Sequence, residues 1–423
     1  MVQPLSSSRS PEPSLPSGAK GHSPVFLARD LAEKTLVVLK FSGWGTLLGM
    51  APLLAGLRQW LPATRIVLAT LRRNAMVAER LPGADRIVGL DDASPGGAVS
   101  PPALLSLARD LRRERPALFL DLQLHTCRRI SLFLALASGA SRRVGFVRTG
   151  DLLRMRGLTD PLFHNRAHPS RLAYGQAALL FGDPAKIDAD RAMAPLLVET
   201  PLDRGEIPPQ IFSQPHRICL MNPNASPRSL ERRWPRENFA RTAEILLRAH
   251  PSLRIVLTGA AGERAETDRI ASGLSLDLRK RVHNLAGSLS FGGLVSLLRR
   301  ADVFVTNDSG PLHLALHLGT PTVGLFGPTR PDPAGDPLSF QNFSALFEPH
   351  YCSPCLYQAP RPPCGGENVC LTSLSVERVV REVELRLARG RAGKSSSAPG
   401  EMRTTSDRGA PLARFTPPGR GRP

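Results

Sequence analysis

Short apolar runs alternate with longer stretches of helical periodicity in the first half of the chain. Runs of strand length are TLVVLKF, RIVLAT, ALFLDL and RRVGF, at residues 35–41, 65–70, 117–122 and 142–146. A continuous apolar strand bounded by glycine or polar residues is typical of a parallel sheet that is buried on both faces. Because helical stretches separate these runs, the pattern predicts βαβ units with helices on both sides of one sheet.

A second series of the same kind begins at residue 216 with HRICLMNP. It continues through alternating helices and strands, at residues 235–250, 253–259, 291–300, 302–307 and 311–318. Between the two series, residues 198–213 (VETPLDRGEIPPQIFS) are polar and contain proline, as interdomain linkers do. We therefore expect an α/β protein with two Rossmann-like, doubly wound domains, at residues 34–200 and 212–389.

The two ends of the chain differ in composition from its interior. Residues 1–33 are rich in serine, proline and glycine, and residues 390–423 form a basic segment of low complexity. Neither segment shows a hydrophobic period, and such segments bury too little apolar surface to offset the loss of conformational entropy. Both are predicted to be disordered tails.

The charge of the chain suggests a polyanionic partner. The 423 residues carry a formal net charge of +19, which fits an anionic membrane face, phosphorylated substrates or nucleic acid, or else an arginine-rich solvated surface. No helix-turn-helix, RNA-recognition or OB signature is present, so no nucleic-acid partner is expected. No apolar run reaches the roughly 18 residues of a membrane span, and the N-terminal segment lacks the apolar centre of a secretory signal. We expect a cytoplasmic protein with reduced thiols.

The loops that follow strands are where ligands bind in doubly wound sheets. The first such loop, SGWGTLLGMAP, is neither G-x-G-x-x-G nor a P-loop, so it is not expected to bind a dinucleotide. Its glycines fit either a close approach to a ligand or only a tight turn. In NPNASPRSLERRWP, the side-chain donors Asn222, Asn224 and Ser226, together with Arg232 and Arg233, fit either a diphosphate site or a solvated basic loop. Glu263, in GAAGER, fits either ribose hydroxyls or the positive end of a helix.

The segment NDSGPLHLALHLG joins a strand to a short helix. Asp308 or Ser309 fits the N-cap, and Pro311 fits the first turn, where no N–H is needed. Backbone N–H groups near Gly310 would form an anion site, and His313 is placed to donate from the first turn. Taken locally, the pattern fits a capped structural helix as well as a phosphate cradle.

Four cysteines near the end of the chain follow the spacing C-x2-C-x8-C-x5-C: Cys352, Cys355, Cys364 and Cys370. In a reduced compartment this grouping favours a structural metal site over disulfides. Zinc, an iron–sulfur cluster and four free thiols all remain open. Cys127 and Cys219 lie in or beside apolar runs and are expected in the core.

Together, these segments resemble the signature of glycosyltransferase family 9, the heptosyltransferase-like enzymes of bacterial lipopolysaccharide assembly. The resemblance is carried by NDSGPLHLALHLGTPTVGLFGPT, NPNAS…ERRWP, GAAGERAE and HNLAGSLSFGGLVSLLRRAD, and it extends from about residue 35 to 388. It implies a GT-B fold, in which two Rossmann-like domains face a cleft. It also implies a metal-independent, inverting transfer of a heptose or similar hexose. The donor would be a nucleotide-diphosphate sugar, and the acceptor a lipopolysaccharide-core or other glycan precursor at the inner membrane surface.

The resemblance also assigns roles to single residues of this sequence. It places the donor phosphates and ribose on the second domain, at Ser226, Arg232, Glu263, Asp308, Ser309, Gly310 and His313. No cofactor is implied for catalysis, which leaves zinc at the cysteines as a structural possibility only.

One position departs from the family pattern. Where the family has a glycine followed by the aspartate that is the candidate base, this chain has Gly45 and Thr46. A threonine hydroxyl does not act as a base near neutral pH. The chain is then an active transferase with its base elsewhere, with Asp121 and His125 as candidates, or a slower enzyme that relies on positioning. The alternative is a nucleotide-sugar-binding homologue without transfer activity.

Overall fold

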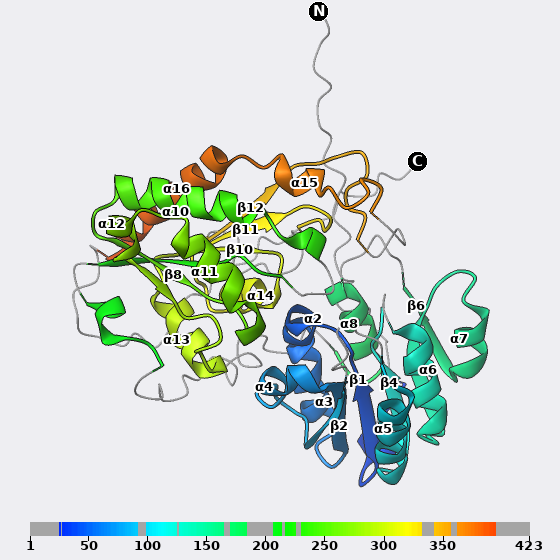
Figure 1. Ribbon diagram of the computed structural model, residues 1–423. Coiled ribbons are helices and arrows are strands. Elements are labelled where there is room, and N and C mark those ends of the chain that lie inside the picture. Colours follow the sequence, from blue (N-terminus) through cyan, green and yellow to red (C-terminus); the bar gives the residue numbers. More distant parts are fainter. Residues whose placement is uncertain are drawn as a thin grey trace, which may run out of the picture.

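The computed structural model describes residues 25–26, 28–91, 99–124, 127–164, 170–183, 206–213, 216–225, 230–331, 342–356 and 362–394. These residues form two α/β domains, each built on a parallel sheet of six strands (Figure 1). The prediction of two doubly wound domains is confirmed.

The sheet of the first domain has the order β3-β2-β1-β4-β5-β6, and each neighbouring pair is parallel. Its strands are β1 (Thr35–Leu39), β2 (Arg65–Leu71), β3 (Arg86–Leu90), β4 (Pro116–Asp121), β5 (Arg142–Val147) and β6 (Asp160–Phe163). Its helices are α1 (Ala28–Leu31), α2 (Trp44–Gly49), α3 (Ala51–Trp60), α4 (Ala75–Ala78), α5 (Pro101–Arg113), α6 (Arg128–Ala137), α7 (Leu152–Gly157) and α8 (Ser170–Ala178). The strand order reverses between β1 and β4, which is where such sheets bind ligands at their carboxyl edge.

The second domain repeats this topology, with the order β12-β11-β10-β7-β8-β9 and all pairs parallel. Its strands are β7 (Arg217–Asn222), β8 (Leu253–Leu257), β9 (Val282–Asn284), β10 (Val303–Asn307), β11 (Thr322–Phe326) and β12 (Phe343–Phe347). Its helices are α10 (Arg236–Ala249), α11 (Arg264–Ser272), α12 (Leu276–Arg279), α13 (Phe291–Arg300), α14 (Gly310–His317), α15 (Val369–Thr372) and α16 (Val376–Lys394). None of the helices in the described part of the chain has the length and apolarity to cross a membrane.

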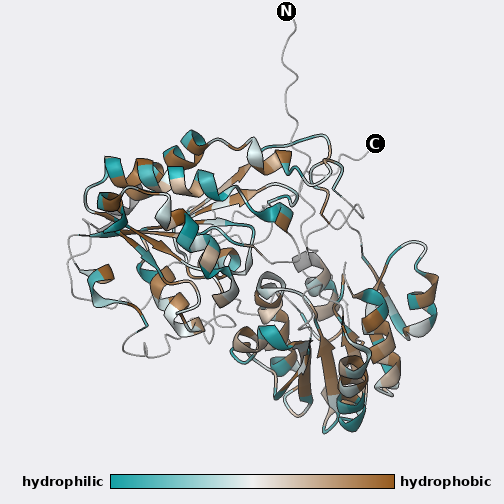
Figure 2. Cartoon of the chain, viewed as in Figure 1, coloured by the Kyte–Doolittle hydropathy of each residue, from teal (hydrophilic) through white to brown (hydrophobic). Residues whose placement is uncertain are grey.

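Apolar central strands build the cores of both domains. Every residue of β1, β10 and β11 is buried, and Figure 2 shows hydrophobic strands enclosed by helices with hydrophilic outer sides. One buried apolar cluster continues from the first domain into the second and includes Ile207 and Ile211. The described part of the predicted linker is therefore packed against a core that the two domains share.

Helices extend into both segments that were predicted as tails. Phe26 is 4% exposed and stacks on Phe181 with 5.3 Å between ring centroids, while Leu31 is also buried. These apolar side chains are too widely spaced for a periodic pattern, yet they find partners on the first domain. At the other end, α16 continues to Lys394, beyond the predicted boundary at residue 389. Residues 1–24 and 395–423 lie outside the described residues.

Candidate functional site

Three strand-end loops of the second domain meet beside the start of α14. The side chain of Asn307, at the end of β10, ties two of them together. Its Oδ1 accepts a hydrogen bond from the backbone N of Trp234 at 3.0 Å, and its Nδ2 donates to the carbonyl of Pro223 at 2.8 Å. The loop after β7 is thereby fixed against the β10–α14 junction. This carboxyl edge of the sheet is where ligands bind in doubly wound folds.

The N-terminus of α14 is not capped by its own side chains. Ser309 occupies the N-cap position with extended backbone, but it makes no side-chain capping bond. Its Oγ lies 3.3 Å from Oγ1 of Thr306 instead. Since the first turn then keeps N–H groups free for an external acceptor, the local geometry fits an anion site better than a self-capped helix.

Asp308 gathers two basic side chains at this helix start. His313 Nε2 lies 3.5 Å from Asp308 Oδ1, and Arg232 Nη1 lies 3.6 Å from Asp308 Oδ2. Burial opposes ionisation of Asp308, but His313 and Arg232 outweigh it and hold the pKa of Asp308 at about 2. The carboxylate is therefore ionised near neutral pH, and it holds both donors beside the N-terminus of α14. The Nε of Arg232 is buried and has no hydrogen-bond partner among the described residues.

Glu263 lies in the loop after the neighbouring strand, β8, and pairs with the other arginine of the ERRWP loop. Arg233 Nη2 is 3.4 Å from Glu263 Oε1, and Glu263 Oε2 accepts a hydrogen bond from Ala260 N at 2.8 Å. Burial raises the pKa of Glu263 above its usual value, against the effect of Ala260 and Arg233. The structure thus assigns the two arginines to two carboxylates, a division that the sequence did not indicate.

Asn224 is one of the donors that the sequence offered in the loop after β7, although the resemblance assigned it no role. It is 3% exposed, and its Nδ2 has no hydrogen-bond partner among the described residues. A Cβ on Gly259 would lie 2.8 Å from this Nδ2, so the amide sits directly against the end of β8.

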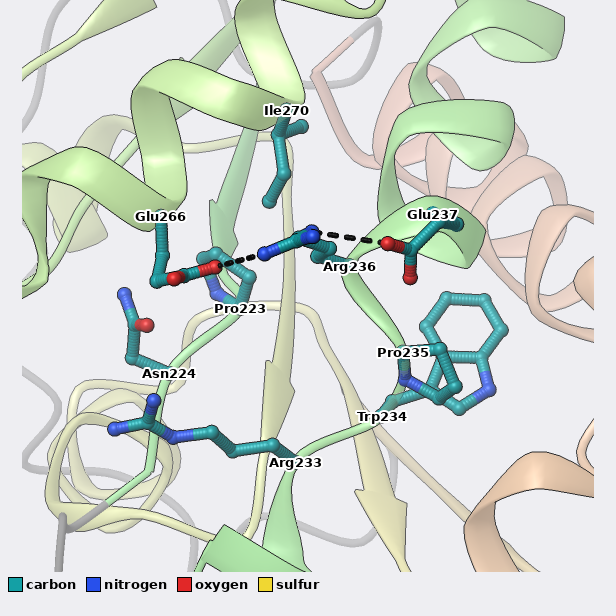
Figure 3. A pocket seen from close by; sticks show the side chains of 9 residues that line it. All are labelled: Pro223, Asn224, Arg233, Trp234, Pro235, Arg236, Glu237, Glu266 and Ile270. Atoms are coloured by element: carbon teal, nitrogen blue, oxygen red, sulfur yellow. Dashed lines mark hydrogen bonds and ion pairs between the residues drawn. The ribbon is translucent and has the colours of Figure 1, made fainter.

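A cavity of about 260 Å³ opens beside this cluster, between the loop after β7 and helices α10 and α11 (Figure 3). Within it, Arg236 bridges Glu237 at 2.9 Å and Glu266 at 2.8 Å. The cavity shares Asn224 and Arg233 with the cluster around Glu263, but it contains none of the predicted residues on or before α14. It therefore adjoins the predicted phosphate site without coinciding with it.

Helix α2 of the first domain packs directly on the N-terminus of α14. A Cβ on Gly45 would lie 2.3 Å from Cδ2 of His313, and one on Gly310 would lie 3.1 Å from Cβ of Trp44. The Trp44 ring meets Phe291 edge-on, with centroids 5.6 Å apart. The glycine loop after β1 is thus more than a tight turn, because it brings the first domain to the predicted phosphate site.

The sequence offered three positions for the catalytic base, Thr46, Asp121 and His125. The Thr46 hydroxyl, next to Gly45, donates to the carbonyl of Gly43 at 2.9 Å. Asp121 has no exposed surface, and its Oδ2 accepts a hydrogen bond from Arg154 Nη2 at 2.8 Å. A sealed, ion-paired carboxylate cannot reach an acceptor hydroxyl, so this geometry does not offer Asp121 as a base. His125 and, on the donor side, Ser226 lie outside the described residues.

The four cysteines of the C-terminal grouping are all free thiols: Cys352, Cys355, Cys364 and Cys370. Burial, reinforced by the neighbouring thiols, raises the pKa of Cys355, and it raises the pKa of Cys370 to about 11. In the part of the chain that the structure describes, no group of three or more His, Cys, Asp or Glu side chains is arranged to hold a metal ion. Cys219 is buried, as expected, and Cys127 is half-buried.

Residues 105–362 match the model of glycosyltransferase family 9 (heptosyltransferase). The chain is 28% identical over 243 residues to lipopolysaccharide heptosyltransferase 1 of Pseudomonas aeruginosa, which covers 53% of this chain and 62% of that protein. It is 34% identical over 100 residues to lipooligosaccharide heptosyltransferase 2 of Haemophilus influenzae, which covers 24% of this chain and 28% of that protein. The chain therefore spans less than two thirds of the length of these curated relatives.

Solved structures show the same fold. The Escherichia coli ADP-heptose lipopolysaccharide heptosyltransferase II is similar with a TM-score of 0.59 and 20% identity, over 85% of this chain and 99% of that chain. A family 9 glycosyltransferase from Veillonella parvula is similar with a TM-score of 0.59 and 19% identity, over 85% of this chain and 98% of that chain. The two domains therefore have the GT-B arrangement that the sequence predicts. Since the family match covers more than half of the chain, the protein belongs to glycosyltransferase family 9.

Proposed function

We propose that this protein transfers a heptose or similar hexose from a nucleotide-diphosphate sugar to a lipopolysaccharide-core or other cell-surface glycan precursor. The observation that carries the proposal is the uncapped N-terminus of α14, where Asp308 holds His313 and Arg232 in place. The names of the relatives and solved structures, which specify heptosyltransferases and ADP-heptose, favour that donor.

The charge on this site suits a leaving nucleoside diphosphate. As the bond between the sugar and the phosphate breaks, negative charge grows on the phosphate oxygens. Backbone N–H groups at Ser309 and Gly310, with Arg232 and His313 beside them, are positioned to stabilise that charge. Four fixed donors of this kind make a metal ion unnecessary, and we propose a metal-independent, inverting transfer. Glu263, next to the buried Asn224, would then accept hydrogen bonds from the ribose.

The acceptor side supports a second candidate function. Thr46 is neutral and hydrogen-bonded back to its own loop, and Asp121 is sealed by Arg154. A donor-binding homologue without transfer activity therefore remains the alternative, with the nucleotide site retained on the second domain.

Donor turnover with a panel of nucleotide sugars, ADP-heptose first, distinguishes the two. Release of nucleoside diphosphate that depends on a lipopolysaccharide-core acceptor supports the transferase. Binding without release, unchanged in Thr46→Asp, supports the alternative. In either case Asp308→Ala should weaken ADP binding at least tenfold, because Arg232 and His313 lose the carboxylate that holds them. Unchanged ADP affinity in this variant would refute the phosphate site.

Two parts of the proposal concern metals and location. Transfer is expected to persist in excess EDTA, and metal analysis of the same sample tests the predicted structural zinc at the cysteines. We propose a cytoplasmic protein that works at the inner face of the membrane, where lipid-linked precursors are built. Fractionation of cells into soluble and membrane parts measures this directly.

A further inference from the structure

Exposed apolar side chains gather on one edge of the first domain. The described part of the chain exposes 13 large apolar side chains, and six of them lie between residues 133 and 163. These six are Phe133, Leu136, Leu152, Leu153, Met155 and Phe163. Three of them, Leu152, Leu153 and Phe163, are more than 60% exposed. Exposed leucines are ordinary when scattered, but a concentration of this kind marks an interaction surface.

These side chains come from two packed helices and the edge strand beside them. Leu132 of α6 faces α7, since a Cβ on Gly157 would lie 2.7 Å from Leu132 Cδ1. At 3.6 residues per turn, Leu136 points about 40° away from Leu132, so it borders α7, and Phe133 points about 100° away on the same side of α6. Figure 1 shows α6, α7 and β6 at the outer edge of the first domain, away from the second domain. We call the six exposed side chains the α6–α7 surface.

Helix α7 has its polarity inverted. Its sequence is LLRMRG, and its buried side chain is Arg154, while Leu152, Leu153 and Met155 face outward. The inward arginine is held by four acceptors, at Phe146 O, Arg128 O, Ser131 Oγ and Asp121 Oδ2. A surface helix normally buries its leucines and exposes its arginines. An internal network that fixes the reverse orientation keeps the apolar side chains available to something outside the protein.

The charges around this surface identify the partner. Arg129 on α6 and Arg156 on α7 are exposed and have no carboxylate partner among the described residues. The nearby carboxylates are neutralised, because Asp151 pairs with Arg128 and Asp160 pairs with Arg142. The surface is therefore apolar with a positive rim. A second copy of this chain would add a second set of arginines without carboxylate partners to a symmetric contact, whereas anionic lipid satisfies both the apolar and the charged component.

We propose that the α6–α7 surface docks this protein on anionic lipid bilayers, with Leu152 and Leu153 entering the interface and Arg129 and Arg156 meeting the headgroups. The proposal extends the proposed function by naming the part of the acceptor domain that faces the membrane. It is tested separately, because vesicles without acceptor report docking alone.

The test uses the full chain and sedimentation with vesicles of phosphatidylcholine, with or without phosphatidylglycerol. We expect binding to the anionic vesicles, reduced at least tenfold in Leu152→Glu/Leu153→Glu. Arg129→Ala/Arg156→Ala should bind more weakly and with a shallower salt dependence. Leu276→Glu is the matched control, since Leu276 is 77% exposed on α12 of the second domain and should not change binding.

ADP affinity and circular dichroism check that each variant is folded, and Phe163→Ser gives an independent loss of binding from β6. Three results would overturn the proposal. The first is that Leu152→Glu/Leu153→Glu and Phe163→Ser both bind the vesicles as well as the wild type does. The second is that the wild type shows no preference for anionic vesicles. The third is that the leucine variant has half the mass of the wild type in light scattering. The last result would assign the surface to self-association. Failure of the wild-type protein to bind ADP would refute the proposed function but would not affect the proposal that the α6–α7 surface docks on lipid.

Discussion

The buried pair of Asp121 and Arg154 allows a sharp test of how the first domain is held together. Asp121 has no exposed surface, Arg154 is 2% exposed, and their side chains are 2.8 Å apart. In Asp121→Asn the guanidinium stays buried without its counter-ion, although its three other acceptors remain. Removing one partner of a buried ion pair costs about 3 to 5 kcal/mol. We expect Asp121→Asn to lower the free energy of unfolding by an amount in this range.

Urea unfolding followed by circular dichroism measures the loss. Asp110→Asn is the control, because Asp110 pairs with Arg113 at 3.2 Å on the surface and its removal should cost under about 1 kcal/mol. Replacing both buried charges, in Asp121→Leu/Arg154→Met, should recover much of the stability, since no buried charge is then left alone. The result that refutes this reasoning is an Asp121→Asn protein of unchanged stability that has lost turnover. Asp121 would then act in the chemistry, as one sequence prediction had it.

Three other changes have expected outcomes of their own. Burial lowers the pKa of Lys40 to about 7 from 10.5, so between these values the unfolded chain holds a proton that the native chain lacks. The free energy of unfolding should therefore rise with pH across this window, by at most about 5 kcal/mol, and Lys40→Met should remove that rise in pH-dependent urea titrations. Glu206 accepts two hydrogen bonds at the N-terminus of α13, so Glu206→Gln should lower the urea midpoint by an amount equivalent to about 1 kcal/mol. In Gly45→Ala the new Cβ would collide with His313, whereas one on Gly43 has no atom within 4 Å. ADP affinity should fall at least tenfold in Gly45→Ala and stay unchanged in Gly43→Ala.

In the first sheet, the strands that the sequence revealed and those it missed differ in their position. The apolar runs predicted β1, β2, β4 and β5, which are all interior strands of the first sheet. Its edge strands, β3 and β6, were missed, and β12 at one edge of the second sheet was missed as well. These three carry exposed or half-buried residues. An edge strand has one strand neighbour, so it lacks the continuous apolar run by which a buried strand is found.

The candidate site divides in a similar way. The sequence proposed donor residues in loops that follow strands, and a doubly wound sheet brings its strand ends to one edge. It placed Asp121 there for the same reason. What it could not show is that Arg154, 33 residues further along the chain, turns inward and seals that carboxylate. Strand position predicts the edge of the sheet at which a side chain lies, but not which other side chain occupies the space in front of it.

Two glycines that no sequence pattern pairs allow the close contact between the domains. Gly45 admits the His313 ring, and Gly310 admits Trp44, so α2 and α14 approach each other through both positions at once. If closure at the phosphate site requires this one contact, Gly45→Ala and Gly310→Ala should act on the same step. The double variant should then lower ADP affinity by much less than the product of the two single effects. Full additivity in this double-mutant cycle would show that the two glycines act independently, and that Gly310 is needed only for the phosphate to approach the helix.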